Sequence, residues 1–171
     1  MEAATPPTIR ALLADITTVQ VDAVVNAANS ALVAGGGVDG TIHRAAGAQD
    51  LSAACAVLGG CDPGDAKVTP GFRLPARFIV HTVGPVWHGG DHGEADVLAS
   101  CYRRSIEVAD EIGIKSIAFP AIATGAFGFP QEQAAQVAVD TLRSVQTSVQ
   151  EVLLVAFDRH VLESYERALV R

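Results

Sequence analysis

Lysine is scarce in this sequence of 171 residues. Two lysines, Lys67 and Lys115, and ten arginines are outnumbered by 19 acidic residues, so the net charge is −7. An acidic surface repels the phosphate backbone, which supplies most of the non-specific affinity of proteins for nucleic acid. We therefore do not expect long nucleic acid as a partner, nor a role as an RNA-associated regulator. A small anionic ligand remains compatible with this charge if backbone N–H groups and helix N-termini hold it.

Cysteines and long apolar segments are also scarce. Cys55, Cys61 and Cys101 form no C-x-x-C pair and no zinc-like spacing, so we expect buried free thiols and no metal site. No run of about 18 uncharged apolar residues is present, so we expect no association with a membrane. The first residues, MEAATPP, lack the basic and apolar regions of a secretory leader. The expected location is the cytoplasm.

The sequence does contain short apolar segments that alternate with amphipathic ones. This alternation predicts a largely parallel sheet with helices on both faces, and ligands of such sheets bind at the carboxyl ends of the strands. No repeat or linker divides the chain, so we expect a single domain over residues 1–171. The predicted strands are 8–13, 23–26, 67–70, 78–83, 116–119 and 151–157, and the predicted helices are 38–46, 49–58, 94–112, 130–145 and 161–169.

A first glycine-rich segment, GGGVDG at residues 35–40, formally matches the dinucleotide fingerprint G-x-G-x-x-G. The fingerprint requires its first glycine directly after a strand, but residues 29–34 intervene here. Asp39 at the helix start suits the helix dipole but would repel a pyrophosphate. We therefore disfavour a NAD-dependent oxidoreductase and expect this helix start to face a neutral group such as a sugar. The alternative is a structural glycine loop that the aspartate caps.

A second glycine-rich segment, TGAFGF at residues 124–129, lies in a ten-residue connection between a strand and a helix. Its glycines permit close approach to a ligand, and successive N–H groups can form an anion-binding nest. The segment has no G-x-x-x-x-G-K-[ST] motif, so it predicts neither an ATPase nor bound Mg²⁺. The unusual length of the connection favours a functional loop over a plain connection.

Asn29, Asp39 and His43 form a third group of interest. Asp39 and His43 are four residues apart and share one face of the predicted helix. They could form a simple polar pair, with the Asn29 amide holding the loop. They could instead surround a sugar, with Asp39 as a base or water holder, His43 as its orienter and Asn29 on a hydroxyl group. The spacing alone does not decide between the two.

The segment HGGDH at residues 88–92 contains two histidines and an aspartate. Its glycines predict a solvated loop rather than a metal site. We expect Trp87, the only tryptophan, to anchor this loop on the core.

Together these segments resemble the macrodomain family, and specifically its hydrolase branch, often called the MacroD type. The resemblance covers most of the chain, and NAAN with GGGVDGxIHxAAG is highly specific. It implies a three-layer α/β/α fold with a mixed sheet, which binds ADP-ribose at the strand ends without a cofactor. The matching segments are 14–47 (with VVNAANS and GGGVDGTIHRAAG), 67–87, 101–130 and 157–158.

The resemblance also assigns residues to the parts of ADP-ribose. Asp15 matches the carboxylate that accepts from the adenine amino group, Ile16 matches a neighbouring backbone contact, and Phe157 matches the position near the adenine face. The resemblance assigns the distal ribose to Asn29, Gly37 and Asp39, with His43 beside them. The flanking residues Gly36 and Val38 complete this loop. The diphosphate is assigned to Thr124, Gly125, Ala126 and Phe127.

Three positions depart from the family's usual residues. Ala14 stands where glycine is common, which alters the approach to Asp15. Ala126 stands where valine or isoleucine is usual. Phe127 stands where tyrosine is frequent, so it can pack on the distal ribose but offers no hydroxyl group. None of these departures removes a catalytic position.

The implied reaction is the hydrolysis of an ester between the distal ribose and an acyl group. The acyl group belongs to an acidic side chain of a mono-ADP-ribosylated protein, or is the acetate of O-acetyl-ADP-ribose. The sequence offers no Ser–His or Cys–His couple, so direct attack by water is the simplest mechanism. Asp39 would position or deprotonate this water, aided by Asn29, His43 and the Gly37 backbone. The alternative is a non-catalytic reader of ADP-ribose, but readers typically lack the Asn29 and Asp39 pair.

Overall fold

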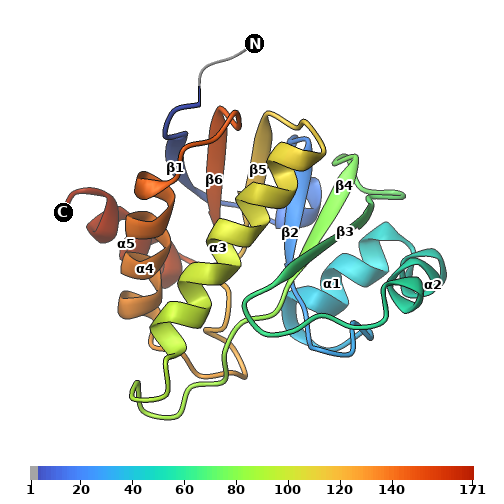
Figure 1. Ribbon diagram of the computed structural model, residues 1–171, viewed down its shortest axis with the longest axis horizontal. Helices are drawn as coiled ribbons and strands as arrows, with labels where there is room; N and C mark the ends of the chain where they lie inside the picture. The colour runs from blue at the N-terminus through green and yellow to red at the C-terminus, as the bar shows by residue number, and fades with distance from the viewer. Residues whose placement is uncertain (1–3) are drawn as a thin grey trace.

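The computed structural model describes residues 4–171, and residues 1–3, which belong to the segment inspected for a leader, lie outside it. Strands and helices alternate along the chain around a six-stranded sheet (Figure 1). The strands are β1 (Thr8–Leu13), β2 (Ala23–Ala27), β3 (Ala66–Pro70), β4 (Phe78–Thr82), β5 (Ser116–Phe119) and β6 (Glu151–Ala156). The helices are α1 (Gly37–Ala46), α2 (Ala48–Leu58), α3 (Glu94–Glu111), α4 (Gln131–Ser144) and α5 (Arg159–Leu169), with a 3-10 turn, η1 (Ile16–Thr18), after β1.

The sheet has the strand order β1-β6-β5-β2-β4-β3. All neighbouring pairs are parallel except β3 and β4, which pair antiparallel. The predicted α/β class with a mixed, largely parallel sheet is therefore confirmed. The exception follows from the short connection between β3 and β4, in which the N–H of Gly71 donates to the carbonyl of Arg77 (2.7 Å). A side chain at Gly71 would lie 2.0 Å from the carbonyl oxygen of Ala76, so this turn requires glycine.

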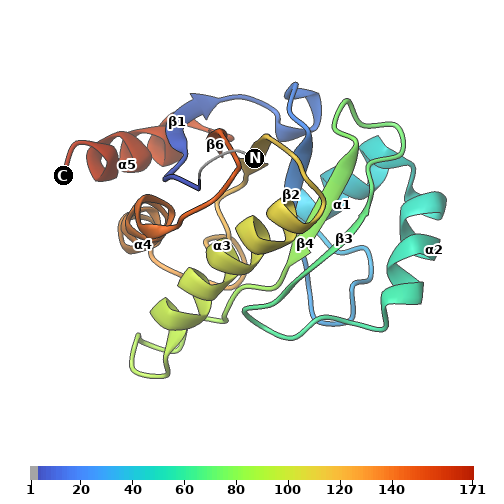
Figure 2. The same ribbon diagram turned by 45° about the horizontal axis from the view of Figure 1, so that its top comes forward.

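Helices cover both faces of the sheet, which makes three layers (Figures 1 and 2). Successive strand residues point to opposite faces, and both Val24 and Val25 of β2 are buried. Val25 packs in the core with α3, α4 and α5, whereas Val24 packs in the core with α1 and α2. Strands covered in this way read as continuous apolar runs, which is why the sequence identified them.

The predicted boundaries of the helices differ from the structure by one or two residues. The clearest case is α5, which begins at Arg159 rather than at residue 161. The carboxylate of Asp158 accepts from the N–H of Val161 (2.9 Å), so Asp158 is the N-cap and the helix starts directly after it. No helix within residues 4–171 has the length and apolar character that crossing a bilayer would require.

The strand order places the predicted ligand-binding segments side by side, at the carboxyl ends of the parallel strands. Each segment follows the carboxyl end of one of four adjacent parallel strands, β1, β6, β5 and β2. With about 4.8 Å between neighbouring strands, this row spans roughly 14 Å. In the order of these strands, the segments are Asp15–Ile16, Phe157, residues 124–127 and residues 29–39.

Candidate functional site

The loop after β2 is held by the side chain of Asn29. Its Nδ2 donates to the carbonyl of Val33 (2.7 Å), and its Oδ1 accepts from the N–H of Val33 (3.2 Å). The interpretation in which Asn29 holds the loop is therefore confirmed. An amide has two donor hydrogens and two acceptor lone pairs, so Asn29 retains one of each for a second partner.

Gly35 lies where Asn29 and Asp39 approach each other. Its N–H donates to Oδ2 of Asp39 (2.8 Å). A Cβ atom at Gly35 would lie 3.1 Å from that oxygen and 3.5 Å from Nδ2 of Asn29. A Cβ atom at Gly40 would in turn lie 2.5 Å from the carbonyl oxygen of Gly35. Glycines at both positions therefore allow the loop to pack directly on the first turn of α1.

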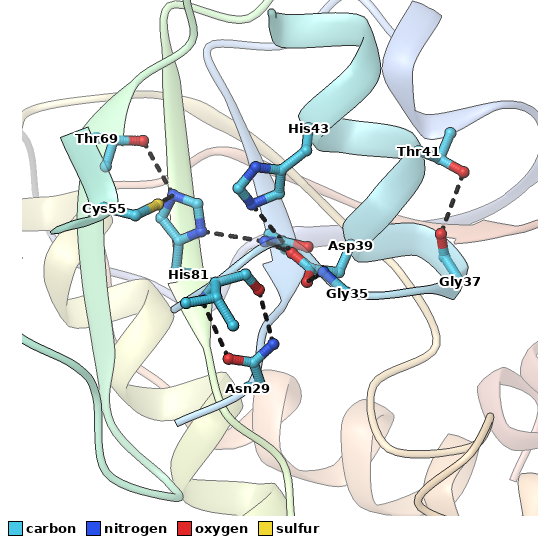
Figure 3. A network of polar contacts seen from close by, with 11 residues as sticks. Asn29, Gly35, Gly37, Asp39, Thr41, His43, Cys55, Thr69 and His81 are labelled. Carbon is cyan, nitrogen blue, oxygen red and sulfur yellow. Dashed lines mark hydrogen bonds and ion pairs between the residues drawn. The ribbon is translucent and has the colours of Figure 1, made fainter. Parts of the chain in front are cut away.

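The carboxylate of Asp39 is almost fully buried, with 8% of its side chain exposed. Its Oδ1 accepts from Nδ2 of Asn26 (2.7 Å) and lies 3.4 Å from Nε2 of His43 (Figure 3). The predicted shared helix face of Asp39 and His43 is confirmed. Nδ1 of His43 is buried and has no hydrogen-bond partner within the described residues.

The polar contacts continue from Asp39 into the core between the sheet and helices α1 and α2. Nδ2 of Asn26 also contacts Nδ1 of His81 (3.1 Å), and Nε2 of His81 contacts Oγ1 of Thr69 (2.9 Å). Burial, with a smaller contribution from the nearby His43, lowers the pKa of His81 to about 4, so this imidazole is neutral at pH 7.

The sequence analysis missed Asn26 and His81, and it found no Cys–His couple. The structure brings Sγ of Cys55 to 3.9 Å from Nε2 of His81. Burial and the charge of Asp39 raise the pKa of the Cys55 thiol, so it stays protonated. Cys55 therefore resembles a core residue rather than a nucleophile, and all three cysteines are free and buried as predicted.

The start of α1 is open to solvent at Gly36 and Gly37. Gly36 is the N-cap residue and supplies no side-chain hydrogen bond to the helix. A Cβ atom at either glycine would meet nothing within 4 Å. The first N–H groups of a helix lack partners inside the helix, so this end offers donors to an oxygen-rich ligand. Val38, the next residue, is half-buried.

The connection between β5 and α4 is ordered by its own carbonyl groups. The N–H of Gly128 donates to Gly125 (3.0 Å), the N–H of Trp87 donates to Phe127 (2.7 Å), and Oγ1 of Thr124 donates to Ala121 (3.1 Å). Within residues 4–171, the N–H groups of Gly125 and Ala126 donate to no other group. Both residues are exposed, so this loop is compatible with the predicted anion-binding nest.

The far end of the row consists of Asp15 and Phe157. Oδ1 of Asp15 accepts from the N–H (2.9 Å) and the hydroxyl (2.7 Å) of Thr17, so Asp15 caps η1. The second carboxylate oxygen accepts nothing within residues 4–171. Ile16 is buried behind it, whereas Phe157 is 75% exposed. This end therefore offers a hydrogen-bond acceptor beside an uncovered aromatic ring.

The loop at residues 88–92 is organised by the carboxylate of Glu94. Glu94 accepts from the N–H groups of His88 (2.8 Å), Gly90 (3.0 Å) and His92 (2.6 Å). Burial acts to raise the pKa of Glu94, but these donors outweigh it and lower the pKa to about 2. Among residues 4–171, no three histidine, cysteine or acidic side chains are grouped as metal ligands.

Trp87 anchors this loop on the core, as predicted. Its ring centroid lies 4.7 Å from that of Phe129, and the ring packs against the core on the face that α3, α4 and α5 cover.

The chain is similar to known proteins along almost its whole length. The Macro domain family matches residues 25–138. A Macro domain-containing protein of Chlorobaculum tepidum is 54% identical over 164 residues, which are 94% of this chain and 95% of the relative. A protein of Klebsiella pneumoniae named O-acetyl-ADP-ribose deacetylase is 50% identical over 164 residues, which are 92% of this chain and 94% of that protein.

The solved structures include the Oceanobacillus iheyensis macrodomain, of which one mutant has been determined with ADP-ribose. It superimposes with a TM-score of 0.90 and 36% sequence identity, and covers 96% of this chain and 93% of its own.

Proposed function

This chain belongs to the macrodomain family, and on that premise we propose that it binds ADP-ribose and hydrolyses esters at the distal ribose. The observation that carries the proposal is the convergence of Asn29 and Asp39 at Gly35. A nearly buried carboxylate and a polar amide meet there beside the open start of α1, where Gly36 and Gly37 leave room for a sugar.

The row of loops supports one direction of binding. The adenine would lie over Asp15 and Phe157, with Ile16 behind them. The diphosphate would bind the N–H groups of residues 124–127, and the distal ribose would reach residues 29–39. Backbone donors at glycines can hold a diphosphate without lysine, which fits the net charge of −7.

The chemistry we propose is direct attack by water on the acyl carbon. Asp39 would orient this water or take its proton, while Asn29 and the Gly37 backbone hold the ribose hydroxyls. His43 would support the carboxylate from the next helical turn. Cys55 and His81 are both buried, which argues against a covalent intermediate. Positioned acid–base assistance of this kind contributes about 10²- to 10⁴-fold.

O-acetyl-ADP-ribose is the first substrate we propose, since relatives about 50% identical carry the name of its deacetylase. Proteins mono-ADP-ribosylated on acidic side chains present the same type of ester, and we propose them as the second substrate. We further propose that the protein acts in the cytoplasm as a single domain over residues 1–171.

The test is a time course of ester hydrolysis for both substrates, with ADP-ribose affinity measured by calorimetry in EDTA. Asp39→Ala should abolish most turnover while the Kd for ADP-ribose stays within about tenfold, or about 1.4 kcal/mol. Asp39→Asn is the isosteric comparison: its amide oxygen can still accept from the N–H of Gly35, but its amide nitrogen then faces the Nδ2 donor of Asn26. Melting curves of both variants separate lost chemistry from lost folding.

Two observations favour a second function, that of a reader without turnover. The carboxylate of Asp39 is 8% exposed, and the Asn29 amide is bonded to Val33. ADP-ribose binding by the unmodified chain without hydrolysis of either ester would establish the reader. Hydrolysis at the same rate by Asp39→Ala would remove Asp39 from the mechanism.

A further inference from the structure

A buried line of hydrogen bonds lies behind Asp39. It passes from Asn26 on β2 to His81 on β4, which face each other in the parallel register, and on to Thr69 on β3. Figure 3 shows His81 between Thr69 and Asp39. Asn26 and His81 are fully buried, and Thr69 is 4% exposed. Such polar groups destabilise a core unless they are hydrogen-bonded.

Each bond in this line has only one possible direction. The Asn26 Nδ2 group can only donate, and it contacts both Oδ1 of Asp39 (2.7 Å) and Nδ1 of His81 (3.1 Å). A flipped amide would place its oxygen against the carboxylate, which repels it. Nδ1 of His81 must therefore be an unprotonated acceptor.

The remaining bonds follow from that assignment. A neutral imidazole with an unprotonated Nδ1 carries its hydrogen on Nε2. Nε2 of His81 then donates to Oγ1 of Thr69 (2.9 Å), and the Thr69 hydroxyl donates to the carbonyl of Pro70 (3.1 Å). The carbonyl of Pro70 thus favours the same tautomer of His81 that the Asn26 amide requires, so both ends of the line support one arrangement.

We propose that His81 and Thr69 are positioning residues, which orient Asn26 so that it holds the carboxylate of Asp39 in its place beside Gly35. The inference rests on the proposed function, because it assigns to this line a purpose in the reaction at Asp39. Among residues 4–171, the buried Oδ1 of Asn26 has no hydrogen-bond partner, whereas its Nδ2 group contacts both Asp39 and His81. This orientation of the amide supports the proposal.

The experiment compares Thr69→Val with Thr69→Ser. Valine keeps the branched shape but offers no acceptor to Nε2 of His81, whereas serine keeps the hydroxyl. Without the acceptor, the other tautomer becomes competitive, and its Nδ1 hydrogen would face the hydrogens of Asn26. Thr69→Val should lower kcat for O-acetyl-ADP-ribose up to about a hundredfold, because small misplacements of catalytic groups have effects of that size. Its Kd for ADP-ribose should stay within about threefold, and Thr69→Ser should recover most of kcat.

A second readout is the tautomer itself. Nitrogen NMR of the labelled protein at pH 7, assigned with a His81→Asn variant, should find the hydrogen of His81 on Nε2 in the unmodified chain. A hydrogen on Nδ1, or equal kcat for the two Thr69 variants, overturns the proposal. A Thr69→Val variant that loses kcat and ADP-ribose affinity alike also overturns it, because the role is then merely structural. Absence of turnover by the unmodified chain refutes the proposed function instead. The tautomer of His81 then still shows whether the hydrogen bonds between Asn26, His81 and Thr69 run in the proposed direction.

Discussion

Acid should destabilise this protein through His81 in a defined pH window. The pKa of His81 falls from 6.5 to about 4 in the folded chain, because burial and then the nearby His43 disfavour the charged ring. Below pH 6.5 the unfolded chain binds a proton that the folded chain does not bind until about pH 4. The stabilising contribution is therefore complete above pH 6.5 and is lost progressively as the pH falls towards 4.

The magnitude follows from the two pKa values. At about 1.4 kcal/mol for each pH unit between them, the loss is about 3 kcal/mol. That is a large share of the roughly 5–15 kcal/mol by which domains are usually stable. With a urea dependence of about 1–3 kcal/mol per molar, the unfolding midpoint should fall by roughly 1–3 M.

The assay is urea unfolding between pH 7 and pH 4, followed by the fluorescence of Trp87. His81→Asn removes the titration, and its side-chain oxygen can accept from Asn26 where Nδ1 did. The variant should be less stable at pH 7 but should lose about 3 kcal/mol less than the unmodified chain on acidification. The ionisable neighbours Asp39, His43 and Cys55 are unchanged, and replacement of the exposed His160 by asparagine is the matched control. Parallel stability curves for His81→Asn and the unmodified chain would refute the reasoning.

Three further predictions concern residues that contact the loops or cap them. Gly40→Ala should cost about 1–3 kcal/mol and impair turnover, because its Cβ would lie 2.5 Å from the carbonyl oxygen of Gly35; Gly36→Ala has open space, and equal melting temperatures for the two variants would contradict this. Asp15→Ala should weaken the binding of ADP-ribose by about 10- to 150-fold but that of ribose 5-phosphate little, if the second carboxylate oxygen of Asp15 binds the adenine amino group. Equal losses of affinity for both ligands in calorimetry, with a lower Tm, would show that Asp15 only caps η1. Glu94→Gln should lower Tm at pH 7, since the low pKa of about 2 stabilises the fold above pH 4.5 and this contribution is lost as the pH falls towards 2; a Tm deficit that is the same at pH 7 and pH 2.5 would exclude this origin.

The fold was predictable because its signals are local. Apolar runs such as residues 23–26, and the glycine-rich segments at 35–40 and 124–129, are recognised from a few neighbouring residues. The shared helix face of Asp39 and His43 was predictable for the same reason, because the two residues are four positions apart. The antiparallel direction of β3 was not predicted. The resemblance implied a mixed sheet without naming the strand, and a short apolar segment does not reveal the direction in which it pairs.

The line behind Asp39 was not predictable from the residues. Asn26 ends an apolar run and looks like the last residue of a buried strand, and His81 occupies a similar place in Phe78–Thr82. Their contact depends on the pairing of β2 with β4, and the contact of His81 with Cys55 depends on how α2 packs. The sequence gives one signal, a polar residue within an apolar strand segment, and that signal does not identify the partner of the residue.

The strand order also has a consequence for the biosynthesis of the protein. The proposed adenine end joins the first strand of the chain to the last, since Thr8 pairs with Glu151. The proposed ribose end, in contrast, comes from one stretch between Asn26 and His43. Contacts between distant segments form late, because a long loop must close first. We therefore expect a nascent chain on the ribosome to acquire its sugar-facing loop early, and to recognise the adenine only after residues 151–157 have emerged.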